Sequence, residues 1–221
     1  MNEQRPRALL SPHRGWVICG GCFLAFLGAA VNATYLIHLG TSVSHLTGDI
    51  SKVAVDVADG HHGLSGAALN LITAAASFVF GAAVAGFFIH HPGIEFSRPY
   101  GRAIIAIAIL LFAADFAFLT FPVLSICLAG LACGFQNALA THYRGMILRT
   151  THVTGLLTDL GTNLGMKLRG HQVAGWKLLV PALLVLSFFI GAVFGSVMIV
   201  ILDWPALTII ASFYLAGGIA W

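Results

Sequence analysis

Long apolar stretches constrain the fold of this chain more than any other feature of its sequence. Six stretches approach or exceed the roughly 20 apolar residues that a helix needs to cross a bilayer, and they lie at 16–38, 67–89, 102–121, 123–142, 178–201 and 205–221. Only 9% of the residues are charged and the mean hydropathy is +0.92, whereas soluble domains have about 25% charged residues. We therefore expect an all-α, polytopic membrane protein with six transmembrane helices in a single membrane domain, residues 1–221.

The basic residues predict the orientation. If the N-terminus is cytoplasmic, ten of the 11 Lys and Arg residues lie on the inner side, and Lys52 alone lies outside. Lys and Arg concentrate in cytoplasmic loops, so both termini are expected in the cytoplasm. The ten inner residues are Arg5, Arg7, Arg14, Arg98, Arg102, Arg144, Arg149, Lys167, Arg169 and Lys177.

In the segments after the first and fourth spans, apolar residues recur at close to the 3.6-residue period of an α-helix. The apolar positions are Val43, Leu46, Ile50, Val53, Ala54 and Val57 in the first segment, and Val153, Leu156, Leu157, Leu160 and Leu164 in the second. Each segment is expected to form an amphipathic helix capped by Ser or Thr. The periodicity leaves open whether these helices lie at the membrane surface, re-enter the membrane or prolong the preceding spans.

Three pairs of matching segments indicate an internal duplication. Segment 22–33 matches 127–138 and pairs Asn32 with Asn137, HLTG at His45 matches HVTG at His152, and SFVFGA at Ser77 matches SFFIGA at Ser187. The offset between partners drifts from 105 to 107 to 110 residues. Repeat 1 then comprises about 16–121 and repeat 2 about 123–221. Because each repeat holds three spans, an odd number, the second must insert inverted, as in the inverted 3+3 repeats of secondary transporters.

The same motifs resemble a known family. The chain has SHLTGD after the first span, NA before it, RTTHVTGLLTDLG after the fourth span and a length near 220 residues. In these features it resembles the YoaK-like family of bacterial multi-pass membrane proteins, a domain of unknown function. The resemblance runs from about Gly20 onward. Asp49 stands where the family commonly has Asn, and His152 where it commonly has an aromatic residue. The resemblance implies the membrane fold and a bacterial inner membrane location, and it adds no activity.

The candidate solute-binding site consists of the small polar residues at the start of both amphipathic segments, with one Asn from each preceding span. A helix start presents unpaired backbone N–H groups and the positive end of the helix dipole, and Gly permits close approach of the backbone to a ligand. Two such starts, inverted and meeting near the midplane, would bind an anion or a polar solute. Alternatively, Ser and Thr only cap helices and each Asn only ties spans together. The candidates are Asn32, Ser44, His45, Thr47, Gly48, Asp49, Asn137, Thr151, His152, Thr154 and Gly155.

Three titratable residues are candidates for proton or ion coupling. His45 and His152 occupy matching positions in the two repeats, and an imidazole in a cavity can exchange protons near neutral pH. Asp115 is an acid inside the predicted third span, where a carboxylate is a functional candidate by default. The alternatives are that each His hydrogen-bonds a helix end and that a protonated Asp115 hydrogen-bonds a neighbouring helix.

The chain has none of the motifs that would indicate an enzyme, such as GxSxG, HExxH or a phosphate loop. An intramembrane enzyme built on Ser44, His45 and Asp49 would lack a distinct set of oxyanion donors. Asp56, Asp59, His61 and His62 are metal-compatible ligand types, but such loop residues are usually only solvated. We therefore expect no catalytic site, metal site or cofactor. The basic residues are expected to contact anionic lipid headgroups and no nucleic acid.

These features predict a transporter or channel for a small polar or anionic solute, with the lipid bilayer as its surroundings and a homodimer as its assembly. The alternative is a non-transporting membrane protein that acts as a partner-binding or envelope component. The positions of the two linkers discriminate between them. If Ser44, Thr47, Thr151 and Thr154 face one polar cavity, transport is favoured; if both linkers lie flat on opposite surfaces, it is not.

Overall fold

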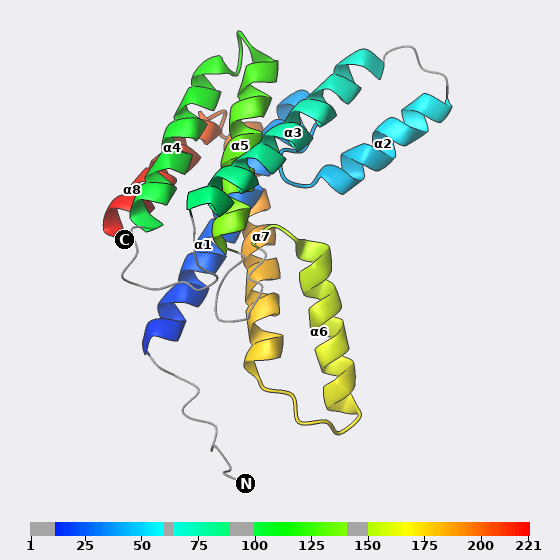
Figure 1. Ribbon diagram of the computed structural model, residues 1–221, viewed down its shortest axis with the longest axis vertical. Helices are drawn as coiled ribbons and strands as arrows, with labels where there is room; N and C mark the ends of the chain where they lie inside the picture. Colours follow the sequence, from blue (N-terminus) through cyan, green and yellow to red (C-terminus); the bar gives the residue numbers. More distant parts are fainter. Residues whose placement is uncertain (1–11, 60–63, 89–99, 141–149) are drawn as a thin grey trace.

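The computed structural model describes residues 12–59, 64–88, 100–140 and 150–221, and these ranges contain eight α-helices and no strand (Figure 1). The helices are α1 (Pro12–Leu39), α2 (Leu46–Ala58), α3 (Leu64–Phe88), α4 (Tyr100–Ala117), α5 (Pro122–Ala140), α6 (Val153–Leu168), α7 (Trp176–Val200) and α8 (Ala206–Ala220). The all-α prediction is therefore confirmed for the described residues. Several residues used above lie outside them: Arg5, Arg7, His61, His62, Arg98, Arg144 and Arg149.

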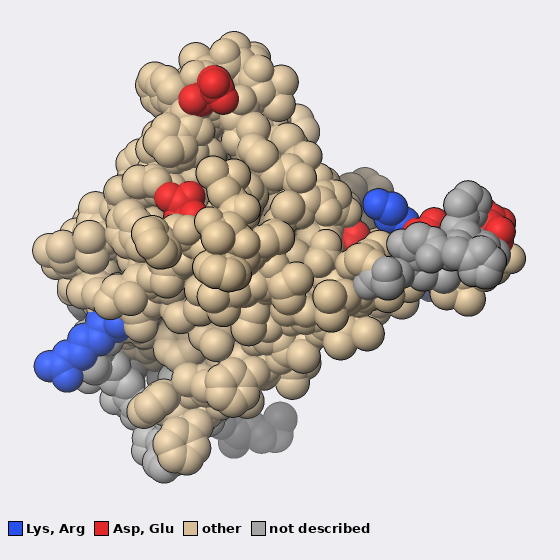
Figure 2. Space-filling view, turned by 90° about the horizontal axis from the view of Figure 1, so that it is seen from above, with Lys and Arg blue, Asp and Glu red and all other residues tan. Residues whose placement is uncertain are grey.

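Five of the six predicted spans are helices long and apolar enough to cross a membrane, namely α1, α3, α4, α5 and α7. The sixth, α8, is apolar but has 15 residues, which rise about 22 Å against a hydrocarbon core of about 30 Å. Charged side chains are few and scattered among the described residues of the face shown in Figure 2. The chain is a multi-pass helical membrane protein.

Most of the closely packed pairs of spanning helices are distant in sequence. Helix α3 packs on α5, α1 on α7, and α4 on both α5 and α8. Glycines permit the closest approaches: a Cβ atom at Gly81 would collide with the carbonyl group of Leu131, and one at Gly191 with that of Phe26. In lipid the hydrophobic effect does not drive helices together, so their association depends on close packing at small residues. The SFxxGA glycines therefore pack helices within one chain.

Buried polar side chains tie α1, α5 and α8 together. The Gln136 amide donates from Nε2 to the carbonyl oxygen of Leu24 at 2.9 Å, and its Oε1 accepts from the Tyr214 hydroxyl. The Tyr35 hydroxyl lies 2.6 Å from Ser125 Oγ, which donates to the carbonyl oxygen of Ala114 at 2.7 Å. Burying these polar groups costs little free energy because each one has a hydrogen-bond partner. The bonds connect α1 and α5, the two helices that carry Asn32 and Asn137.

The two predicted amphipathic helices are present as α2 and α6. Each packs on the helix that follows it, α2 on α3 and α6 on α7. In Figure 1 they begin near each other at mid-height and run apart, α2 upward and α6 downward. Leu156 is the one buried side chain among the described residues of both helices. The elements that carry the HLTG and HVTG motifs thus start close together and project from the bundle.

Candidate functional site

Asn32 holds the linker between α1 and α2. This side chain is 7% exposed, and its Oδ1 accepts from the backbone N–H of Val43 at 3.1 Å, from the N–H of Ser44 at 3.2 Å and from Ser44 Oγ at 3.1 Å. One buried amide oxygen therefore fixes the turn from which α2 starts. The oxygen is fully used, so Asn32 positions the candidate site and does not line it.

The linker between α5 and α6 has a similar arrangement. Thr151 Oγ1 donates to Asn137 Oδ1 at 2.7 Å, and Asn137 Nδ2 donates to the carbonyl oxygen of Cys133 at 2.9 Å. Thr151 stands at the position that the motif alignment pairs with Ser44. In both linkers a hydroxyl just before the helix donates to an Asn of the preceding span.

This arrangement corrects the predicted helix caps. The N-cap residues are His45 and His152, and neither makes a side-chain cap hydrogen bond. Ser44 and Thr151 do not cap because their hydroxyls bond to Asn32 and Asn137. An α-helix leaves its first N–H groups without intrahelical acceptors. The first turns of α2 and α6 therefore keep open donors and the positive ends of two helix dipoles.

Both linkers line one pocket of about 530 Å³, which we call the shared pocket. Its polar lining comes from both repeats, and Leu46 and Val153, the first residues of α2 and α6, also belong to it. Among the described residues no Lys or Arg lines this pocket, so within the described ranges the two helix starts supply its positive potential. The lining residues are Ser44, His45, Leu46, Thr47, Phe78, Asn137, Thr151, His152, Val153 and Thr154.

His45 is the most enclosed titratable group of the shared pocket. Its ring packs edge-on against Phe188 of α7, with 4.8 Å between ring centroids and 81° between planes. Its Nε2 is buried and has no hydrogen-bond partner among the described residues. Burial lowers the pKa of His45 from its ordinary value of 6.5, and His152 lowers it further while Asp49 opposes the shift. The imidazole is therefore neutral at pH 7, with one ring nitrogen available to a ligand or a proton.

His152 is exposed and lies against the first turn of its own helix. A Cβ atom at Gly155 would collide with His152 Nδ1, whereas a Cβ atom at Gly48 would meet nothing within 4 Å. Gly155 thus makes room for a histidine ring of the same chain. Neither glycine lines the shared pocket, so their predicted role in approaching a ligand is not reflected in the geometry.

Asp49 lies outside the shared pocket and stabilises the first linker. Its Oδ2 accepts from the N–H of Ser42 at 2.5 Å and from Thr41 Oγ1 at 3.2 Å. A carboxylate in the first turn of a helix is also favoured by the helix dipole. Asp49 faces a separate pocket of about 160 Å³ with Lys52 and Asn70 among its lining residues.

Asp115 is also remote from the shared pocket. Helix α4 ends at Ala117, four residues before the predicted end of the span, so Asp115 lies in its last turn and not in the middle of a spanning helix. Its Oδ2 accepts from Thr208 Oγ1 of α8. The geometry matches the alternative in which Asp115 hydrogen-bonds a neighbouring helix.

Two aromatic residues of the site were missed as candidates. Phe78 lines the shared pocket, and Phe188 contacts His45. They occupy matching positions in the SFVFGA and SFFIGA motifs, one in α3 and one in α7. The repeat was therefore the signal that could have identified them, but an apolar aromatic residue in a span is usually read as packing.

Comparison with known proteins identifies the family. No curated protein and no solved structure gives a significant match. The family of proteins of unknown function DUF1275 matches residues 20–220, which include all the residues of the shared pocket. Since this match covers nearly the whole chain, the protein belongs to the DUF1275 family.

Proposed function

We propose that this protein is a transporter or channel for a small polar or anionic solute and that the shared pocket is its binding site. The observation that carries the proposal is that Ser44, Thr47, Thr151 and Thr154, from linkers more than 100 residues apart, line one pocket. A membrane component that only binds a partner has no need for two separate polar helix starts around a common cavity.

The helix contacts support an inverted repeat. Exchanging α1 with α5, α2 with α6, α3 with α7 and α4 with α8 turns the α3–α5 contact into the α7–α1 contact and the α2–α3 contact into α6–α7. The same exchange turns α4–α5 into α8–α1, and it maps the collision partners of Gly81 onto those of Gly191. In inverted-repeat transporters the substrate lies between the repeats, and access alternates as one repeat moves against the other.

The chemistry of the pocket favours an anion of low charge or a neutral hydrogen-bonding solute. The Ser44 and Thr151 hydroxyls donate to Asn32 and Asn137, so the donors left for a solute are the hydroxyls of Thr47 and Thr154, the imidazoles and the open N–H groups of two helix starts. Together these groups favour negative charge. In the part of the chain that the structure describes, no basic side chain contributes to the lining, so there a multiply charged anion would lack full compensation. A small monovalent anion fits this donor set best.

His45 links binding to protons in this proposal. A bound anion beside the imidazole favours the protonated form, so anion and proton bind with positive cooperativity. His45 is the stronger candidate because its ring is enclosed, while His152 is exposed. Asp115 has no part in the pocket and is left out of the proposed coupling.

The remaining parts of the proposal concern the setting of the protein. We place it among YoaK-like proteins in a bacterial inner membrane, with both termini cytoplasmic, because of its motifs and its basic residues. We also propose a homodimer, supported by exposed apolar side chains on α3 and α7 such as Phe80 and Phe189. Transport by this route involves no chemical reaction, so no enzymatic activity is proposed.

The test combines binding and flux measurements on the purified full chain. A thermal shift screen compares chloride, nitrate, formate and acetate with the neutral solutes acetamide and glycerol, and positive solutes are then tested for flux in liposomes. In the double variant T47V/T154V, loss of two hydroxyl bonds at about 1 kcal/mol each weakens binding roughly thirtyfold. The matched control is Thr162→Val, an exposed position on α6 outside the pocket. Equal affinity and flux in the double variant and the control would remove the shared pocket as the solute site.

A further inference from the structure

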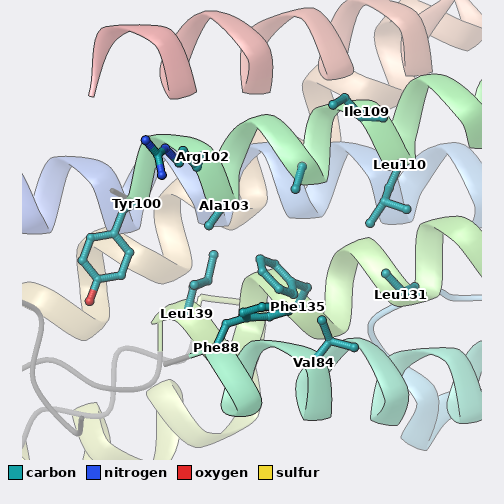
Figure 3. Close-up of a pocket in the computed structure, with 11 residues that line it drawn as sticks. Val84, Phe88, Tyr100, Arg102, Ala103, Ile109, Leu110, Leu131, Phe135 and Leu139 are labelled. Atoms are coloured by element: carbon teal, nitrogen blue, oxygen red, sulfur yellow. The ribbon is translucent and has the colours of Figure 1, made fainter. Parts of the chain in front are cut away.

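A second, apolar cavity lies between α3 and α4, and we call it the α3–α4 groove. It has a volume of about 620 Å³, and α5 forms its floor through Leu131, Phe135 and Leu139. Figure 3 shows Val84 and Phe88 of α3 on one side and the α4 residues on the other, with Leu110 and Ala103 pointing toward the space between the helices. None of the described residues lines both this groove and the shared pocket.

The groove exists because α3 and α4 stand apart. Among the described residues no Cα atom of α3 lies within 8 Å of one of α4, whereas the matching helices α7 and α8 do touch. The chain has 11 residues between the end of α3 and the start of α4, but only five between α7 and α8. The longer connection permits the separation. The side chains of Ala103 and Ala106 on α4 are small and leave room in the groove.

One end of the groove is polar and basic. Tyr100 and Arg102, in the first turn of α4, lie at one end in Figure 3, and Leu110 and Leu131 lie at the other. Arg102 is exposed and has no carboxylate within 4 Å in the part of the chain that the structure describes. The cation is therefore available to an anionic group that sits at the end of an otherwise apolar groove.

The dimensions match one leaflet of a bilayer. From Arg102 to Leu110 the helix rises about 12 Å, compared with about 15 Å for half of the hydrocarbon core. The positive-inside distribution places the Arg102 end at the cytoplasmic surface, where anionic lipids create a negative surface potential. An acyl chain can follow the apolar walls while its headgroup phosphate reaches Arg102.

We propose that the α3–α4 groove binds an anionic phospholipid, with one acyl chain between α3 and α4 and the headgroup phosphate paired with Arg102. The groove is closed on the third side by α5, which packs closely on α3 at Gly134. The lipid thus fills a space that the helices of repeat 1 leave open and that repeat 2 closes by direct contact between α7 and α8.

The experiment is native mass spectrometry of the full chain in detergent, titrated with phosphatidylglycerol or with phosphatidylcholine that has the same acyl chains. The expected result is roughly fivefold tighter binding of phosphatidylglycerol, as for one basic side chain at an anionic membrane surface. Arg102→Gln should abolish this preference. The matched control Lys177→Gln removes an exposed basic residue in the first turn of α7 and should keep it.

A second variant tests the acyl-chain part. Ala106 is exposed and lines the groove, so Ala106→Trp fills the space without disturbing buried packing, and it should weaken the binding of both lipids. Ala106→Leu serves in its place if the Trp variant unfolds at a lower temperature. The proposal is overturned if Arg102→Gln keeps the headgroup preference, or if filling the groove leaves lipid binding unchanged. It is also overturned if Ala106→Trp dissociates a dimer while lipid binding persists, because the occupant would then be a second copy of the chain.

Discussion

The contact between α1 and α7 is the sharpest place to test the packing that builds the shared pocket. Helix α1 carries Asn32, and α7 carries Phe188, which contacts His45. The two helices approach closely at Gly191, where an added Cβ atom would lie 2.6 Å from Phe26 Cα, against the 3.4 Å at which ordinary van der Waals contact begins. The Phe26 carbonyl oxygen would lie closer still, so the substitution Gly191→Ala must push the backbones of α1 and α7 apart.

The size of the effect follows from two opposing contributions. Overpacking costs about 1–3 kcal/mol, and the upper end applies because the obstacle is backbone that cannot change rotamer. Ala gains about 1 kcal/mol over Gly in a helix. The net loss of unfolding free energy is then about 2 kcal/mol, which lowers the Tm of a chain of this length by roughly 4–8 °C.

Thermal unfolding of the detergent-solubilised protein measures this shift in Tm, and two further variants serve as a comparison and a control. Gly81→Ala should cause a similar loss because its Cβ would meet Leu131 in the same way, while Gly86→Ala should be neutral or stabilising because nothing lies within 4 Å of it. The reasoning would be refuted if Gly191→Ala unfolded at the same temperature as Gly86→Ala. Unequal losses at Gly81 and Gly191 would count against equivalent packing in the two repeats.

Two further predictions concern the linkers. Burial lowers the pKa of His45 in the folded protein, so as pH falls the unfolded chain binds a proton before the folded chain does, and stability is lost below about pH 6.5. The variant His45→Gln should therefore show a smaller decrease of Tm between pH 7 and pH 5. An unchanged decrease would contradict the burial argument. Asn32→Leu removes the acceptor of three hydrogen bonds and leaves two N–H groups unpaired, which should cost about 2–4 kcal/mol of unfolding free energy in denaturation measurements. Asn163→Leu, which removes one exposed bond on α6, is its control, and equal losses in the two variants would contradict the role of Asn32.

Several features of the site could be predicted from the sequence because they depend on local pattern. The 3.6-residue period of 43–57 and 153–164 predicts two amphipathic helices, and they are present as α2 and α6. The alignment of Asn32 with Asn137 and of Ser44 with Thr151 places matching hydrogen-bonding groups in both repeats. Repeated short motifs carried this information even though neither copy alone distinguishes a binding site from a helix cap.

Other features could not be read from local pattern because they depend on which groups compete for the same partner. Ser44 is of a residue type favoured at helix N-caps, yet its hydroxyl donates to Asn32, and His45 is the N-cap residue. Asp49 resembles a ligand residue, but the nearer N–H of Ser42 uses its carboxylate. Asp115 resembles a buried functional acid, but α4 ends two residues later and Thr208 bonds to it.

Apolar length and charge within each segment were enough to predict a helical membrane protein, and the spacing of short motifs predicts two related halves, because all of these signals are local. The packing of all the helices brings the starts of α2 and α6 to one pocket and leaves a groove between α3 and α4. His45 and Phe188 are 143 residues apart, and their contact depends on how closely glycines let α1 and α7 pack. Distances of that kind are set by the sum of all helix contacts, which no single segment encodes.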